Sequence, residues 1–228
     1  MSEILYKPEN KIVSVVLIGA FNPFMFQPNW FSANDIISQS EIDAMLSNKT
    51  TPFIFATNLT IFNTAQLHIH VQEDRFTVTG IKESFCMVKD VVKKTFERLG
   101  AMVITAMGIN TSAHFKMPNL SKYHEFGDRL SPKGIWKDFL GDNVSGDDRT
   151  GGLISMQMMN QKEDKSGSFN IIVERSVRIF PGIFINCNDH YQFDENTDAE
   201  TVMQKLEDNF DASIKKSIEI QNSLFRDL

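Results

Sequence analysis

The stretch LHIHVQEDRFTVTGI alternates between apolar and polar side chains, and this period of two constrains the fold more than any other feature of the chain. Successive side chains of a β-strand point to opposite faces of its sheet. Leu67, Ile69 and Val71 are therefore expected to face a core. His68 and His70 are expected on the opposite face, and the polar segment EDR predicts the turn of a β-hairpin.

Other apolar runs predict further strands, and four segments with helical spacing or helix-start signals predict helices. The expected strands are 12–21, 53–62, 66–72, 75–81, 101–115, 151–161, 169–180 and 183–193. The expected helices are 32–46, 84–100, 131–141 and 198–225. In the second of these helices an apolar stripe recurs at every third or fourth position, which predicts that one side faces the core.

The order of these elements is strand, helix, three strands and helix, and it occurs twice, with a break near Gly100. The sequence therefore predicts an α+β protein of two similar strand-helix-three-strand-helix halves with antiparallel sheets and a long C-terminal helix. The halves are expected at residues 1–100 and 101–228, within one compact unit. Their sheets are expected to join edge to edge or to pack face to face.

The composition of the chain indicates which kinds of partner and which cellular compartment to expect. The formal net charge of −6 disfavours nucleic acid as a partner, since Lys and Arg normally neutralise phosphates. The run 12–21 is about half the length of a membrane span, so no membrane association is expected. Cys86 and Cys187 are the two cysteines and form no C-x-x-C pattern, which favours a reducing, cytoplasmic setting.

Several short phrases resemble a sporadically distributed family of prokaryotic proteins of about this length that has no established activity. The phrases are FNP after the first strand, VQEDRF in the hairpin, GINTSAHF after the middle helix and INCNDHYQF before the last helix. The resemblance supports the expected fold and implies a prokaryotic system. By analogy with the sporadic distribution, it points to mobile elements or phage defence.

His68 and His70 are candidate metal ligands, because imidazoles two residues apart on a strand point to the same side. Zinc or another divalent metal would then need a third or fourth ligand, for which His114, His124 and His190 are available. The alternative is an ordinary polar strand face, exposed or covered by a partner.

Two further segments carry groups that could perform chemistry. Cys187 and Asp189 are expected on one strand face and His190 on the other, which argues against a local Cys–His pair. The loop 140–152 holds Asp142, Asp147 and Asp148, whose oxygens could bind a cation, or which could belong to an ordinary surface loop.

Arg175 is expected on an apolar strand face, because residues 171, 173, 177 and 179 share its side in strict alternation. Such an arginine pairs with a buried acid or lies at a cleft where an anion binds. The C-terminal helix, in particular residues 212–228, is long enough to overhang one sheet and is a candidate dimer contact.

The sequence favours a non-catalytic binding or assembly protein of a prokaryotic system, with a protein partner or self-association and no cofactor. It would act through sheet edges, the loop 140–152 and the terminal helix. One alternative is a metal-dependent hydrolase that uses His68 and His70. Another is an anion or nucleic-acid binder that uses basic side chains, namely Lys93, Lys94, Arg98, Arg175 and Arg178.

Overall fold

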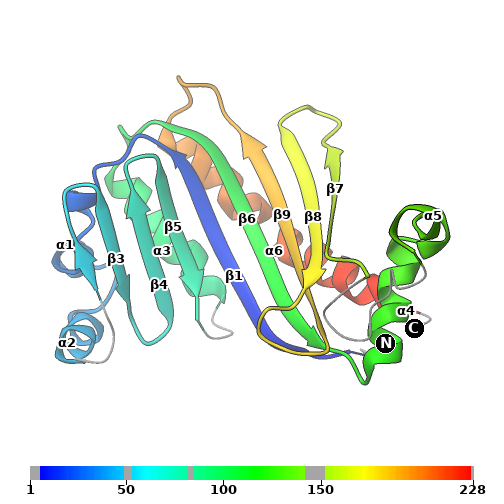
Figure 1. Cartoon of the computed structure of the whole chain (residues 1–228). Helices are drawn as coiled ribbons and strands as arrows, with labels where there is room; N and C mark the ends of the chain where they lie inside the picture. The colour runs from blue at the N-terminus through cyan, green and yellow to red at the C-terminus, as the bar shows by residue number, and fades with distance from the viewer. Residues whose placement is uncertain (1–5, 49–52, 82–84, 142–151, 227–228) are drawn as a thin grey trace.

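The chain folds around one nine-stranded antiparallel sheet, with the strand order β2-β3-β4-β5-β1-β6-β9-β8-β7 (Figure 1). This computed structural model describes residues 6–48, 53–81, 85–141 and 152–226. The strands are β1 (Pro8–Gly19), β2 (Ile54–Phe55), β3 (Leu59–Asn63), β4 (Leu67–Gln72), β5 (Arg75–Gly80), β6 (Ile104–Lys116), β7 (Ser155–Gln161), β8 (Gly167–Arg175) and β9 (Gly182–Gln192).

The long ladder between β1 and β6 forms the centre of the sheet. It pairs Val13 with Thr111 and Leu17 with Met107, so strands from before and after Gly100 join edge to edge. The remaining strands of each side continue outward, with β5 beside β1 and β9 beside β6. The sequence left open whether the two sheets join edge to edge or pack face to face. The pairing of β1 with β6 shows that they join edge to edge.

The described helices are η1 (Pro23–Met25), α1 (Pro28–Ala33), α2 (Gln39–Ser47), α3 (Phe85–Arg98), α4 (Leu120–Leu130), η2 (Lys133–Ile135), α5 (Lys137–Leu140) and α6 (Ala199–Leu224). Helices α3 and α6 pack against one face of the sheet, whereas η2 and α5 bury no residue. Figure 1 shows α3 and α6 behind the sheet, with no described helix in front of it. Alternation along β1 follows from this arrangement: Val13, Val15 and Leu17 are fully buried, whereas the residues between them are half-buried.

Phenylalanine fills much of the space between the sheet and the helices. The rings of Phe76 on β5 and Phe96 on α3 meet edge to face, with centroids 5.0 Å apart. A second apolar cluster lies under β6, β8 and β9, where Phe225 packs against Phe126 at 4.9 Å and Tyr6 at 4.8 Å. The last turn of the chain therefore completes this second cluster, close to the beginning of β1.

The structure confirms the hairpin of β4 and β5, the helix α3 and the long C-terminal helix α6. The expected single helix over 32–46 is wrong, because α1 ends at Ala33 and Asp35 has a positive φ of 56°. A new helix then begins after Ser38, whose hydroxyl accepts the N–H of Glu41. The strand expected over 53–62 is likewise divided into β2 and β3.

The largest error concerns residues 116–141. A loop was expected around Pro118, but α4 begins directly after Asn119, whose side chain accepts the N–H of Lys122 at 2.9 Å. Tyr123 and Phe126, one turn apart, bury its inner side. The helix expected over 131–141 is reduced to the short elements η2 and α5.

No helix among the described residues is both long and apolar enough to cross a bilayer. The C-terminal part of α6 does not overhang the sheet, since Ser213, Ser217 and Gln221 are all buried. The side chain of Gln221 donates to the backbone oxygen of Thr111 on β6 at 3.3 Å. One side of this part of the helix is therefore occupied by intramolecular packing, and the dimer contact stays a prediction for its exposed side.

Candidate functional site on the open face of the sheet

The face of the sheet that carries no described helix is the largest surface on which the chain presents polar side chains in a fixed pattern. We call it the open face. Strand alternation brings His68 and His70 of β4 to it, together with Asn110 of β6 and Asn188 of β9. Each of these side chains is half-buried by its neighbours on the sheet. The open face thus combines fixed geometry with access from outside.

The strand registers align seven hydrogen-bonding side chains in one line across the open face. We call this line the polar row. From β3 to β8 it consists of Asn63, His68, Thr79, Ser14, Asn110, Asn188 and Asn170. Its members come from residues far apart in the sequence, and only the pairing of the strands places them side by side.

A neighbouring line two residues along the strands contains the other histidines. Its members are Ile61, His70, Thr77, Val16, Gly108, His190 and Ser168. His70 and His190 therefore share a face and a line, but four strand spacings separate them, or about 19 Å. His190 cannot complete a metal site with the His68/His70 pair.

His68 and His70 lie beside each other as the alternation predicts, with ring centroids 6.3 Å apart. Nδ1 of His68 hydrogen-bonds with the side-chain oxygen of Asn63. Nε2 of His70 is buried and has no hydrogen-bond partner among the described residues. Burial lowers the pKa of both imidazoles; the charge of His70 adds to the effect on His68, and that of Arg75 adds to the effect on His70.

Of the remaining histidines, His114 shares the open face with Asn110 by alternation along β6, but it lies four residues farther along that strand, opposite Phe184 of β9. His114 bonds with the hydroxyl of Ser176 at 2.9 Å and packs on Phe184, and His124 lies on α4. Within the described part of the chain, no three His, Cys, Asp or Glu side chains come together as a metal site would require. A zinc site would therefore have only His68 and His70 as ligands among the described residues, and it stays a prediction.

Asn188 and Gly108 form the centre of the open face. A methyl group on Gly108 would lie 2.9 Å from Oδ1 of Asn188, so the asparagine side chain leans over the bare glycine backbone. This oxygen is also buried without a hydrogen-bond partner in the described structure. An unsatisfied buried acceptor costs free energy until a donor meets it.

Neither line of side chains contains Asp, Glu, Lys or Arg, although the whole chain carries a net charge of −6. The basic residues considered for an anion site do not gather on this face either. Lys93 pairs with Glu207 of α6 at 3.0 Å, on the helical side of the molecule. The two lines therefore offer amide, hydroxyl and imidazole groups, while the charged side chains of Arg75 and Glu174 lie farther along the same face.

Arg175 ends β8 on the helical side of the sheet, in line with buried Val173. The expected continuation of this strand to residue 180 is wrong. The Ser176 hydroxyl accepts the N–H groups of Arg178 and Ile179 in a turn, and Val177 is 87% exposed. Arg175 instead lines a cavity of about 230 Å³ with residues of α4 and this turn, namely Tyr123, Ser176, Val177, Phe180 and Gly182.

The predicted separation of Cys187 and Asp189 from His190 is confirmed, since the first two are buried under α6 and His190 lies on the open face. Burial raises the pKa of the Cys187 thiol to about 11, so this thiol is not a nucleophile at neutral pH. Asp142, Asp147 and Asp148 lie outside the described residues.

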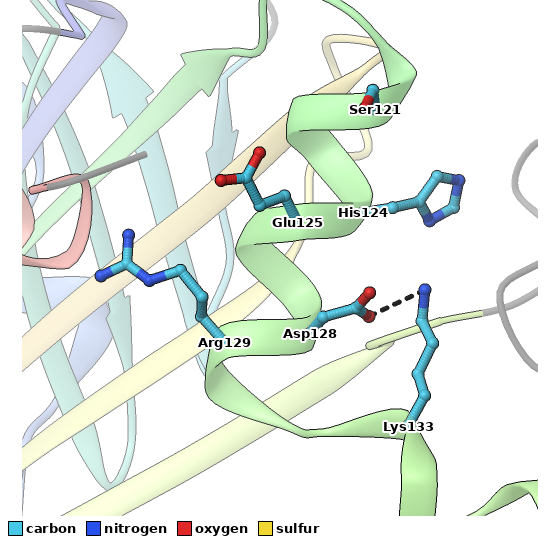
Figure 2. Close-up of a pocket in the computed structure, with 6 residues that line it drawn as sticks. All are labelled: Ser121, His124, Glu125, Asp128, Arg129 and Lys133. Carbon is cyan, nitrogen blue, oxygen red and sulfur yellow. Dashed lines mark ion pairs between the residues drawn. The ribbon is translucent and has the colours of Figure 1, made fainter.

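A shallow groove along α4 has a hydrolase-like composition that the sequence analysis missed. It is lined by Ser121, His124, Glu125, Asp128, Arg129 and Lys133 (Figure 2). Figure 2 shows Asp128 directed at Lys133, and their charged atoms are 2.7 Å apart. Because this carboxylate is paired with an ammonium, it does not orient His124 as the acid of a catalytic triad does. The groove is the polar outer surface of α4.

No protein-family model matches this chain, and no curated protein matches it either. The fold and the open face therefore define the class: an α+β protein whose antiparallel sheet is covered by helices on one side and presents an uncharged polar row on the other.

Proposed function

We propose that the chain is a non-catalytic binding protein whose open sheet face accepts a protein partner. The observation that carries this proposal is the polar row, in which the strand registers align hydrogen-bonding side chains across the open face with Asn110 and Asn188 side by side. A sheet face that no helix covers and that carries regularly spaced amide side chains can form hydrogen bonds with an uncharged polar surface of a partner. The resemblance to a sporadically distributed prokaryotic family favours a prokaryotic system linked to mobile elements or phage defence.

A binding role is supported over a catalytic one by the state of the reactive groups. The Cys187 thiol is buried with a raised pKa, and Asp128 is paired with Lys133. The His68/His70 pair supplies two of the three or more ligands that a catalytic zinc ion takes from a protein. Each candidate reaction therefore lacks a component among the described residues.

Binding of nucleic acid has weaker support. Lys93 is paired with Glu207, and Lys89 shares the same carboxylate at 2.8 Å, so these ammonium groups are already neutralised in part. Binding to nucleic acid depends on Lys and Arg side chains that neutralise phosphates and thereby release the counterions bound to the nucleic acid. We expect the protein to pass through a polyanion column at low salt without retention, and salt-dependent retention would favour the nucleic-acid alternative.

We further propose that the sheet consists of two similar halves joined at β1 and β6. Support comes from the strand order, in which β5-β1 on one side mirrors β6-β9 on the other, and from the helix that follows each set of strands, α3 and α6. The core crosses this junction, because α6 packs on α3 as well as on β6. The halves would accordingly share one core and fold as one unit.

Site-specific photocrosslinking tests the binding proposal. A photoreactive amino acid is placed at Thr79 or Asn170 on the polar row, and at exposed Gln204 on α6 as the matched control. We expect a discrete adduct from the two open-face positions that is absent from position 204. The double variant Asn110→Ala/Asn188→Ala should abolish it. Equal adducts from position 204, or adducts that persist in the double variant, would contradict the proposal.

A further inference from the structure

The two edges of the sheet differ in the length of unpaired backbone that they expose. One edge is β2, which is two residues long, and the other is β7, which runs over seven residues. An edge strand presents main-chain donors and acceptors to any other strand, and short edge strands limit this. The β2 edge is protected in this way, whereas the β7 edge is not.

Within its own seven residues, β7 also lacks charge, proline and a bulge, which are features that protect sheet edges. Its sequence, SMQMMNQ, contains no charged residue and no proline. Its register with β8 is unbroken from Ser155 opposite Glu174 to Gln161 opposite Ser168, so no bulge turns the edge away. Met158 and Met159 are 59% and 69% exposed. Such a strand is suited to pairing with another strand.

The ladder with β8 determines which main-chain groups point outward. The N–H of Arg175 donates to the oxygen of Ile154 at 3.2 Å, and that of Lys162 donates to the oxygen of Gly167 at 2.9 Å. Because antiparallel residues alternate in the side to which they bond, the even-numbered residues of β7 bond to β8. Ser155, Gln157, Met159 and Gln161 therefore direct their N–H and C=O groups away from the sheet.

We propose that β7 pairs with β7 of a second copy of this chain, antiparallel about a twofold axis at Met158. In this register all seven residues pair, with Gln157 opposite the partner's Met159 and Met158 opposite its own copy. The four outward-directed residues then form the hydrogen-bonded pairs of the new ladder. The interface goes beyond the proposed function, since it uses an edge rather than the open face.

The uncharged sequence of β7 makes this edge compatible with a second copy as the occupant. Two chains with a net charge of −6 repel each other over most of their surfaces, and β7 brings no charge into their contact. A twofold pairing places identical strands together, which any charge at a central position would oppose. The helix α5, whose Phe139 is 83% exposed, lies on the β7 side of the sheet (Figure 1).

A pair of charge variants tests the register. Gln157→Lys/Met159→Lys places lysines opposite each other in both copies, whereas Gln157→Lys/Met159→Glu places each lysine opposite a glutamate. Sedimentation velocity should find a dimer for the natural chain, at least about tenfold weaker association for the first variant and recovery for the second. Circular dichroism checks that both variants fold. A monomeric natural chain, or equal association of the two variants, would overturn the proposal.

Cysteine crosslinking supplies an independent measurement. Opposed residues of a non-hydrogen-bonded pair have Cα atoms about 4.5 Å apart, within the range of a disulfide. In a Cys86→Ser background, which removes the exposed natural thiol, Met158→Cys should form a covalent dimer under mild oxidation. The matched control Ser155→Cys lies opposite the partner's Gln161 and should not crosslink to its own copy. Equal yields of covalent dimer from the two positions would contradict the proposed twofold axis.

Discussion

The ammonium of Lys162 lies 2.6 Å from the carboxylate of Asp189, and the two side chains are only 21% and 9% exposed. Lys162 follows β7, and its ammonium lies 2.9 Å from the ring centroid of Tyr191. Asp189 also accepts the hydroxyl groups of Tyr191 at 2.9 Å and of Ser213. Burial lowers the pKa of Lys162, although the hydrogen bond and charge of Asp189 raise it. The pair joins the β7–β8 hairpin to β9 and α6.

Asp189→Asn should lower the free energy of unfolding by about 2–3 kcal/mol, because it leaves the largely buried ammonium of Lys162 without its carboxylate. Lys162→Met is the matched control. It preserves apolar contact with Tyr191, and Asp189 keeps two hydroxyl donors, so the loss should be smaller. Urea unfolding of both single variants and the double variant gives the coupling energy. Equal losses for the two single variants would show that the buried charge is not the cause.

Acid should destabilise the protein through the histidines of β4. The folded-state pKa values of His68 and His70 lie below 6.5, so the unfolded chain binds protons first as the pH falls. Their contribution is fully present above the unfolded pKa and is lost as the pH falls from about 6.5 towards the folded pKa. Unfolding free energies at about pH 7.5 and pH 5.5 measure the effect.

The double variant His68→Asn/His70→Gln should reduce this pH dependence, because neither replacement titrates in that range. His114 also has a lowered pKa, caused by burial and the nearby charge of Arg178, and should account for part of the remaining dependence. An unchanged pH dependence in the double variant would assign the effect to groups outside β4.

Zinc should bind the untagged protein weakly. Two imidazoles alone provide half of a tetrahedral site. Calorimetry should therefore detect no stoichiometric tight site, and His68→Ala/His70→Ala should change the titration little. One tightly bound zinc ion per chain that disappears in this variant would instead support the metal-dependent alternative and require further ligands from outside the described residues.

Two glycines of the central strands should differ sharply in tolerance. A methyl group on Gly19 would lie 2.2 Å from the backbone oxygen of Val103, so Gly19→Ala should cost about 1–3 kcal/mol. The nearest atom to a methyl group on Gly108 is the mobile side-chain oxygen of Asn188, at 2.9 Å. Gly108→Ala should destabilise the protein less, and adding Asn188→Ala should remove the remaining steric conflict. Thermal unfolding of Gly19→Ala, Gly108→Ala, Asn188→Ala and the double variant Gly108→Ala/Asn188→Ala measures the order of their stabilities.

Sequence patterns predicted the elements whose signals are local. The alternation around His68 specifies its hairpin, and the apolar stripe that includes Phe96 specifies α3. The helix α4 was not predicted because Pro118 suggested a loop, whereas Asn119 directly after it is the N-cap of the helix. Asp35 shows the opposite error, since one residue with positive φ divides a helix that periodicity alone would continue.

The polar row could not be predicted from the sequence, for a different reason. Asn110 and Asn188 are opposite each other only because β6 and β9 pair with one particular register. A shift by one residue would send one of the two side chains to the helical side. That register depends on packing between strands about 75 residues apart, and no local pattern records it. The alternation could identify which residues of each strand share a face, but not their neighbours across the sheet.

The position of β1 in the centre of the sheet has a consequence for synthesis. Its partner β6 begins only at Ile104, after both the β4–β5 hairpin and α3. During translation, β1 can pair with β5 while its other edge stays unsatisfied until β6 emerges from the ribosome. Formation of the β1–β6 ladder therefore closes a long chain segment, which slows folding relative to local pairing. A central strand of the finished protein therefore has, for that interval, one unpaired edge in the nascent chain.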